Sequence, residues 1–266
     1  MILIAEKINT INKKVAEALE KKDVDFFRNM ATSQTESGRV DAVDINVGSD
    51  ISKEPDNMKW AVSVVEETLG GRVPLSIDSP NPETIIAGFD AMKEKKGSYI
   101  NSVTLQGEKY KELLPLAKEY DLNVIAMPIG QKEIPPTAEK RYKNSYIISE
   151  IINDHGIPLE RLYLDCLVTP ISISKDNAKI SLDTLKLIKK NITQARTIIC
   201  IASISFGLPG KSVLNSIFLS LLAQEGLDAV LMDPFDKGVM GAIHALDVLQ
   251  GKDEYCINYL KYVGRK

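Results

Sequence analysis

Three hydrogen-bonding side chains, Asp78, Asn101 and Asp165, each follow a short apolar run in the 266-residue sequence. A carboxylate such as Asp165 can accept two parallel N–H bonds, which suits a 2-amino-4-oxo heterocycle that presents an amine beside a ring N–H. An amide such as Asn101 offers both a donor and an acceptor for the remaining polar edge of such a ring. These residues predict an acceptor-rich wall of a ligand pocket, unless they form a buried network that only satisfies backbone groups at strand ends.

A lysine on a glycine-rich turn, Lys211, suggests two further kinds of site. The stretch SFGLPGKS differs in one position from the phosphate-binding pattern G-x-x-x-x-G-K-[ST], because Ser205 replaces the first glycine. Pro209 lacks the backbone N–H that such a loop uses to bind phosphate, and the Cβ of Ser205 hinders a close approach. We therefore disfavour a P-loop-like nucleotide triphosphatase. We expect Lys211, near the start of a helix, to bring positive charge to an anionic or carbonyl group at the rim of a pocket.

The elements that must position these side chains are short β-branched runs that alternate with longer amphipathic stretches. The short runs predict strands at Ile2–Ala5, Ala42–Val47, Val73–Ile77, Ser98–Ile100, Asn123–Ala126, Arg161–Leu164, Thr197–Ile201 and Ala229–Met232. The amphipathic stretches predict helices at Asn57–Gly71, Pro82–Lys95, Glu108–Tyr120, Ala138–Asp154, Ser181–Lys190, Val213–Gln224 and Lys237–Leu249. Eight strand–helix units in about 250 residues favour a closed (β/α)₈ TIM barrel. An open doubly wound sheet is the alternative.

In a closed barrel, the carboxyl ends of all strands face one mouth, where catalytic groups are placed. Some polar residues at strand ends can instead cap the helix that follows. Capping explains Asp78 poorly, because Ser79 and Asn81 are already available as caps, and Asp165 stands well before the next helix. We therefore expect Asp78 and Asp165 to line a pocket. No linker or low-complexity segment divides the chain, so we expect a single domain over residues 1–266.

Composition excludes several classes of protein. The formal net charge of −3 and the lack of a long basic run argue against nucleic-acid binding. The apolar segment before Glu6 is too short for a signal peptide, and no apolar stretch approaches the roughly 20 residues of a membrane span. Two histidines argue against a multi-histidine metal centre, so we expect no metal site. Three widely spaced cysteines indicate reduced thiols and a cytoplasmic protein, namely Cys166, Cys200 and Cys256.

Six short motifs occur in an order that is typical of pterin-binding methyltransferases. They are EKIN at 6–9, DINVG at 44–48, IDSPN at 77–81, INS at 100–102, YLDCLVTP at 163–170 and ISFGLPGK at 204–211. Over nearly its full length the chain resembles the methyltetrahydrofolate–corrinoid protein methyltransferases. It is also similar to the folate module of cobalamin-dependent methionine synthase. Dihydropteroate synthases are more distant relatives with the same barrel.

The resemblance implies roles for individual residues. Asp78, Asn101 and Asp165 match residues that hold the pterin ring, which agrees with the wall expected from their chemistry. Asn46 matches an asparagine near the same pocket, and Lys211 falls where a basic residue often lies beside the pterin. Glu6, from the first motif, completes the predicted pterin site.

One departure from the family pattern concerns the reaction itself. Corrinoid methyltransferases usually carry an Asn after the seventh strand that hydrogen-bonds N5, the nitrogen that bears the methyl group. Ser203 stands at this position here. The resemblance implies that Ser203, with Asp78 and Asn101, acts in catalysis. Because serine is shorter and a weaker aid to removing methyl from N5, we expect tetrahydrofolate to be the methyl acceptor.

The expected reaction is methyl transfer between N5 of tetrahydrofolate and a corrinoid (cobalamin) carried on a partner protein. The resemblance also implies a homodimer. A folate-binding subunit without activity is the alternative that Ser203 leaves open. A dihydropteroate synthase is less favoured, because the N-terminal AEKINT lacks the N-V-T-P-D-S-F loop of that family.

Overall fold

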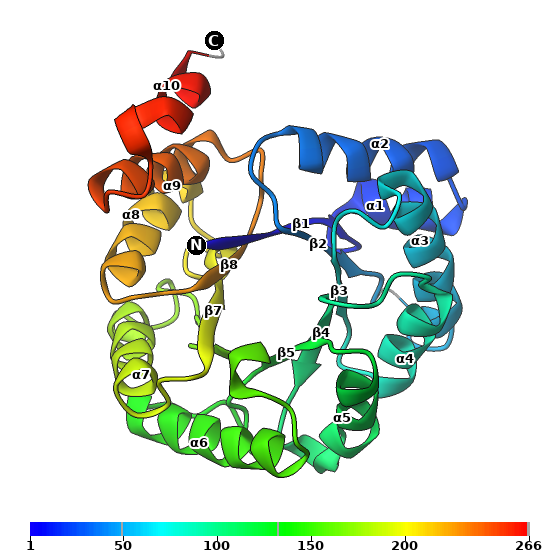
Figure 1. The fold of residues 1–266 in the computed structure, drawn as a ribbon, viewed down its shortest axis with the longest axis horizontal. Helices are drawn as coiled ribbons and strands as arrows, with labels where there is room; N and C mark the ends of the chain where they lie inside the picture. Colours follow the sequence, from blue (N-terminus) through cyan, green and yellow to red (C-terminus); the bar gives the residue numbers. More distant parts are fainter. Residues whose placement is uncertain (49, 132, 265–266) are drawn as a thin grey trace.

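Eight parallel strands close into a barrel in chain order, and helices surround it (Figure 1). The computed structural model describes residues 1–48, 50–131 and 133–264, so the predicted domain over 1–266 includes positions outside the described residues. The strands are β1 (Ile2–Asn9), β2 (Ala42–Asn46), β3 (Leu75–Asp78), β4 (Tyr99–Val103), β5 (Asn123–Ala126), β6 (Leu162–Asp165), β7 (Arg196–Cys200) and β8 (Ala229–Met232). The pairing of β1 with β8 completes the barrel. The predicted (β/α)₈ fold is confirmed, and the open doubly wound sheet is excluded.

The helices form an outer ring around the strands (Figure 1). They are α1 (Lys13–Glu20), α2 (Val24–Glu36), α3 (Glu54–Leu69), α4 (Pro82–Ala91), α5 (Tyr110–Glu119), α6 (Ala138–Asp154), α7 (Asn177–Asn191), α8 (Lys211–Gln224), α9 (Lys237–Leu249) and α10 (Ile257–Val263). Helix α10 projects beyond the ring at the C-terminal end of the chain. Among the described residues, no helix has both the length and the apolar character needed to cross a membrane.

Four helix starts differ from the sequence prediction: α3 begins at Glu54 and not Asn57, α5 begins at Tyr110 and not Glu108, and α7 and α8 begin earlier than expected. Helix α7 begins at Asn177, before the expected Ser181, and the side-chain amide of Asn177 donates to the carbonyl of Pro170 at 2.8 Å. This bond attaches the first turn of α7 to the loop after β6. Helix α8 begins at Lys211 because Gly210 adopts a left-handed conformation (φ 64°) just before it, which glycine does at little steric cost. Lys211 is therefore the first residue of α8.

The inside of the barrel follows the two-residue period of the strands, since alternate side chains of a strand share one face. One inward layer is apolar and consists of Ile4, Ala42, Tyr99, Ile125, Tyr163, Ile198, Ala229 and Leu231. Two residues further along β1, β2, β4, β6 and β7, the inward positions become Glu6, Asp44, Asn101, Asp165 and Cys200. The apolar layer therefore fills the barrel beneath a set of polar groups at the carboxyl ends of the strands.

Aromatic side chains of the apolar layer pack together and close the interior of the barrel below the polar groups. The rings of Tyr99 and Tyr163 meet edge to face with centroids 5.3 Å apart. Arg196 Nη1 donates to the hydroxyl of Tyr163 at 2.6 Å. Because a packed barrel interior offers no channel, a ligand reaches the inner polar groups from the carboxyl end of the barrel.

Helix α4 approaches strand β3 closely at Gly88. A Cβ placed on Gly88 would lie 2.8 Å from Ile77 Cγ2 and 3.0 Å from Met58 Cγ. Both neighbours are fully buried, in β3 and α3. The missing side chain at Gly88 thus lets α4 and α3 pack against the strand that ends at Asp78.

Candidate functional site

The polar groups at the carboxyl end of the barrel come from β1, β2, β3, β4, β6 and β7. We call this set the polar ring, and it consists of Glu6, Asp44, Asn46, Asp78, Asn101, Asp165 and Cys200. Most of these residues are half-buried, whereas Asp44 and Asn101 are buried. Because the half-buried side chains remain partly exposed, a ligand can reach the polar ring from the mouth of the barrel.

Hydrogen bonds between side chains join the ring across β2, β3 and β4. Asn46 Nδ2 donates to Asp78 Oδ2 at 2.9 Å. Asp44 Oδ1 accepts from Asn101 Nδ2 at 3.1 Å and from Ser76 Oγ at 2.6 Å. These bonds fix the orientation of the Asn46 and Asn101 amides. Asp78 thus bonds a side chain of the neighbouring strand β2, and Asn101 bonds a side chain of β2 across β3, in contrast to the backbone-satisfying network that the sequence left as an alternative.

A second contact joins β1 to β7 on another side of the mouth. The thiol of Cys200 donates to Glu6 Oε2 at 3.2 Å. Ser203, in the short 3₁₀ helix η3 (Ile201–Ser203) that follows β7, hydrogen-bonds the same thiol. Glu6, Cys200 and Ser203 therefore form one connected group.

Asp165 is held by the loop that follows β6. Its Oδ1 accepts from the backbone N–H of Leu167 at 2.7 Å, and Leu167 adopts a left-handed conformation with φ 58°. Arg141 of α6, only 2% exposed, supports this loop by donating to the carbonyls of Cys166 and Leu167 at 3.3 and 2.5 Å. It also donates to the carbonyl of Pro135, in the loop before α6, at 3.0 Å. The hydrogen bonds of the described residues leave Asp165 Oδ2 available to a ligand.

Burial raises the pKa of two carboxyls at the mouth, those of Glu6 on β1 and Asp165 on β6. The pKa of Glu6 rises to about 7, because burial and the nearby charge of Asp78 outweigh the hydrogen bond from Cys200. The pKa of Asp165 rises to about 6, because burial outweighs the Leu167 hydrogen bond and the positive charge of Arg141. Both groups thus change protonation state close to neutral pH, which is common where catalysis or ligand binding takes place.

Asp44 and Asp78 form a mutually repelling pair on adjacent strands. Burial, followed by the charge of Asp78, raises the pKa of Asp44 well above its usual range, although Ser76 and Asn101 donate to it. Burial also raises the pKa of Asp78, against the hydrogen bond from Asn46. At most one negative charge is therefore favoured on this pair without a ligand that donates hydrogen bonds.

Among the residues that the structure describes, Lys211 is the one predicted site residue that lies outside the polar ring and has no hydrogen bond or ion pair to it. It is exposed on the first turn of α8. The charge of another lysine, Lys7 of β1, acts on Glu6 of the polar ring, and Lys7 Nζ lies 2.9 Å from Asp233 Oδ2, just after β8.

Three residues of the site were not among the sequence candidates, namely Asp44, Cys200 and Arg141. Period-two alternation along β2 and β7 places Asp44 two residues from Asn46, and Cys200 two residues from Ile198. That signal was present in the sequence. The contact of Cys200 with Glu6 places this cysteine in the polar ring. Arg141 gave no local signal, because its partners lie in distant loops.

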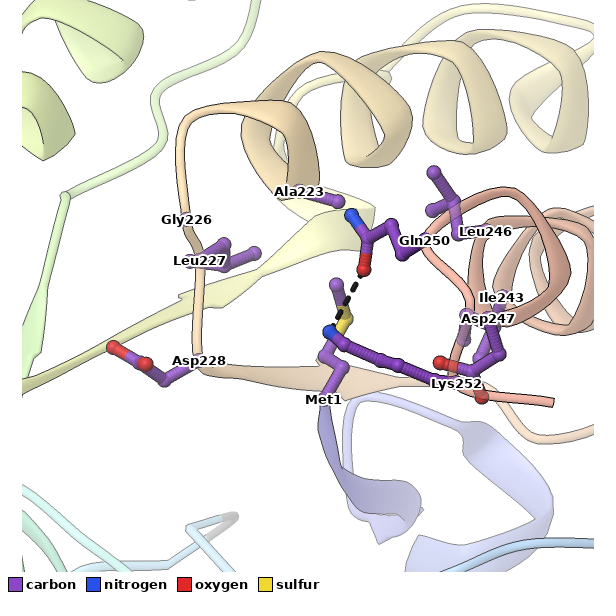
Figure 2. A pocket seen from close by; sticks show the side chains of 10 residues that line it. All are labelled: Met1, Ala223, Gly226, Leu227, Asp228, Ile243, Leu246, Asp247, Gln250 and Lys252. Carbon is purple, nitrogen blue, oxygen red and sulfur yellow. Dashed lines mark hydrogen bonds between the residues drawn. The ribbon is translucent and has the colours of Figure 1, made fainter. Parts of the chain in front are cut away.

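A cavity of about 360 Å³ lies at the other end of the barrel (Figure 2). Met1, just before β1, and Asp228, just before β8, contribute to its lining. Gln250 and Lys252, from the turn after α9, are hydrogen-bonded at 2.8 Å beside Met1. Because the amino ends of β1 and β8 border this cavity, it is separate from the polar ring.

Comparisons with known proteins agree with the fold and identify the family. The family model described as "Pterin binding enzyme" matches residues 5–233. A methylcorrinoid:tetrahydrofolate methyltransferase of Eubacterium limosum is 34% identical, over 98% of this chain and 95% of the relative.

Solved structures of similar fold include two dihydropteroate synthases. The enzyme from Xanthomonas albilineans in complex with 7,8-dihydropteroate has a TM-score of 0.66 and 18% identity, over 94% of this chain and 92% of that chain. The enzyme from Thermus thermophilus in complex with 6HMPPP has a TM-score of 0.68 and 14% identity, over 94% of both chains. At this identity the two structures support the barrel fold alone. The family match and the full-length relative show that the chain belongs to the pterin-binding enzymes.

Proposed function

We propose that this chain transfers a methyl group from a methylated corrinoid, carried by a partner protein, to N5 of tetrahydrofolate. The observation that carries the proposal is the polar ring, whose hydrogen-bonding groups stand at the mouth of a pterin-binding barrel. The name of the full-length relative, a methylcorrinoid:tetrahydrofolate methyltransferase, supports the same reaction and direction. We further propose that residues 1–266 act as one pterin-binding domain. Its cytoplasmic location and homodimeric state remain predictions.

The pterin ring would bind along the β3, β4 and β6 side of the mouth. Asp165 would accept the 2-amino group and the neighbouring ring N–H, since a carboxylate can take two parallel hydrogen bonds. Asp78 and Asn101 would meet the remaining polar positions of the ring. Asn46 would act through Asp78, because its amide already donates to Asp78 Oδ2 at 2.9 Å.

In the proposed reaction, the lone pair of N5 forms the new N–C bond while the carbon–cobalt bond breaks. The electron pair of that bond stays on cobalt, and N5 then gives up its proton. The main task of the chain is to hold N5 in line with the incoming methyl group, and such alignment contributes several kcal/mol to catalysis. Ser203 would contact N5 through a bridging water, since its side chain is shorter than asparagine. Lys211 remains the proposed basic residue beside the pterin.

The rim around the mouth offers a surface for the corrinoid protein. Six of the loops that follow strands each expose a large apolar side chain, namely Ile11, Ile51, Ile134, Ile173, Phe206 and Phe235. Ile11, Ile51 and Ile173 are more than three-quarters exposed, at 86, 83 and 78%. Exposed apolar residues grouped on one face are typical of interaction sites. Because a protein-bound methyl group must reach the mouth, its carrier must contact this rim.

Anaerobic absorbance spectroscopy with methylcobalamin and tetrahydrofolate tests the proposed function. We expect the methylcobalamin spectrum to decay to that of cob(I)alamin only when the protein and tetrahydrofolate are both present. Substitution of Asp165 by Asn should abolish this decay, whereas Asp90→Asn, on the exposed face of α4, should leave it unchanged. Tetrahydrofolate binding without turnover, even with methylated corrinoid proteins, would favour the folate-binding subunit instead.

A further inference from the structure

We propose that Glu6 accepts the proton that N5 loses during methyl transfer, and that Cys200 positions the Glu6 carboxyl for this task. This inference rests on the proposed function and names a catalytic group for it. N5 of tetrahydrofolate carries a hydrogen, so methylation first produces a positively charged nitrogen that bears both the new methyl group and this hydrogen. The N–H bond electrons return to N5 when the proton leaves. One acceptor near N5 therefore completes the reaction without any further reactant.

The placement of Glu6 suits a contact with N5. The wall formed by Asp78, Asn101 and Asp165 lies on β3, β4 and β6, and it is complementary to the pyrimidine half of a pterin. N5 belongs to the other half of the ring system, which would point across the mouth. Glu6 on β1 and Cys200 on β7 stand there, on either side of β8.

Glu6 differs from the other carboxyls of the polar ring in the hydrogen bonds that it accepts. Asp44 accepts from two neutral side-chain donors, Asp78 accepts from an amide, and Asp165 accepts from a backbone N–H. Among the described residues, the Glu6 carboxyl has one hydrogen-bond donor, the Cys200 thiol at 3.2 Å. A thiol is a weak donor. Glu6 thus keeps most of its capacity to accept a proton from a ligand.

The charges around Glu6 also favour a proton acceptor. Burial raises its pKa to about 7, and the groups that face it are Asp78 of β3, Asp44 of β2, Asp233 after β8, Lys7 of β1 and Cys200 of β7. The only cation in that set, Lys7, is already paired with Asp233 at 2.9 Å. Ionised Glu6 therefore lies among negative groups, and taking up a proton relieves their repulsion. A base with a pKa near the working pH is the most effective.

The affinities of the two folates at two pH values provide a test that needs no corrinoid. Ionised Glu6 should favour tetrahydrofolate, whose N5–H can donate to it. Protonated Glu6 should favour 5-methyltetrahydrofolate, whose N5 can only accept. With a pKa of about 7, anaerobic calorimetry at pH 6 and pH 8 should show the two affinities changing in opposite directions, each by up to about tenfold. The Glu6→Gln variant should bind both folates, and their affinities should not change in opposite directions between pH 6 and pH 8. The same substitution should lower kcat by about 10²–10⁴-fold.

Cys200→Ala tests the positioning role separately. The hydrogen bond from the thiol lowers the pKa of Glu6. Loss of this bond should therefore raise the pKa of Glu6 and move the crossover of the two affinities to higher pH. Cys256→Ala, at the start of the distant α10, should leave the crossover unchanged. A crossover that persists in Glu6→Gln would overturn the inference while the proposed function stands. Failure of the wild-type protein to bind either folate would overturn both.

Discussion

Asp165 is the residue on which pterin recognition most directly depends. One of its oxygens accepts from Leu167, and the ionised carboxylate is the form that can accept two N–H bonds from the ligand. Asp165→Asn replaces an acceptor by a donor, so we expect tetrahydrofolate binding to weaken by about 1.5–3 kcal/mol. Calorimetry against Asp90→Asn measures the difference. The pKa of Asp165 is about 6, so wild-type affinity should fall as the pH drops below 6. Equal affinity at pH 5 and pH 7 would contradict this role.

Ser203 determines how well methyl can be removed from N5. An asparagine at this position would reach N5 directly and stabilise the nitrogen as a leaving group. We therefore expect Ser203→Asn to raise the rate of demethylation of 5-methyltetrahydrofolate more than the rate of the opposite transfer, under conditions where the folate site is saturated. Single-turnover rates in both directions measure this ratio. The overall equilibrium cannot change, and an unchanged ratio of the saturated rates would show that Ser203 does not govern direction.

Among the elements, α4 and β3 approach each other closely at Gly88. Alanine there would gain about 1 kcal/mol of helix propensity. Its Cβ would also press on Ile77 at 2.8 Å, and Ile77 is buried and branched at Cβ. Because overpacking typically costs about 1–3 kcal/mol, we expect Gly88→Ala to lower the free energy of unfolding. Urea unfolding measures the change. Asp90→Ala, exposed on the same helix, should remain within about 0.5 kcal/mol of wild type. A stabilised Gly88→Ala would contradict the close packing.

The barrel and much of its site could be predicted at the level of elements, because strand periodicity is a local property. Strand ends such as Asp78 and Asp165 were evident from apolar runs followed by polar residues. The contact between Glu6 and Cys200 was not evident, since 194 residues separate them and only barrel closure through β8 brings them together. Helices α1 and α2 were not assigned ranges either. They are capped by Asn12 and Asp23, and their buried faces are small.

Across the whole molecule, the carboxyls of the polar ring should make stability depend on pH. Their pKa values are higher in the folded protein than in the unfolded chain. Between about pH 4 and 7 the folded state therefore binds more protons, and stability falls as the pH rises through this window. One pKa unit corresponds to about 1.4 kcal/mol. We expect a higher melting temperature at pH 5.5 than at pH 8, and Asp44→Asn should reduce the difference. A melting temperature that rises towards pH 8 would contradict this view.

The apolar rim should affect encounters with a protein but not with a small molecule. Ile11→Glu places a charge on the rim without touching the polar ring. We expect transfer from a methylated corrinoid protein to slow at least about fivefold, which corresponds to 1 kcal/mol of binding. Transfer from free methylcobalamin and affinity for tetrahydrofolate should not change. Leu249→Glu, 82% exposed at the end of α9, is the matched control. Equal slowing by both substitutions would argue against docking at the rim.

The most direct test of the proposed methyl transfer is to follow a labelled methyl group. The purified protein is incubated without oxygen with ¹³C-methylcobalamin and tetrahydrofolate, and ¹³C NMR identifies the atom that carries the label. We predict a new N-methyl carbon, assigned to 5-methyltetrahydrofolate, that appears with wild type and not with Asp165→Asn. A label that stays on cobalt while calorimetry shows tetrahydrofolate bound, with free methylcobalamin and with methylated corrinoid proteins alike, would contradict the proposed transfer.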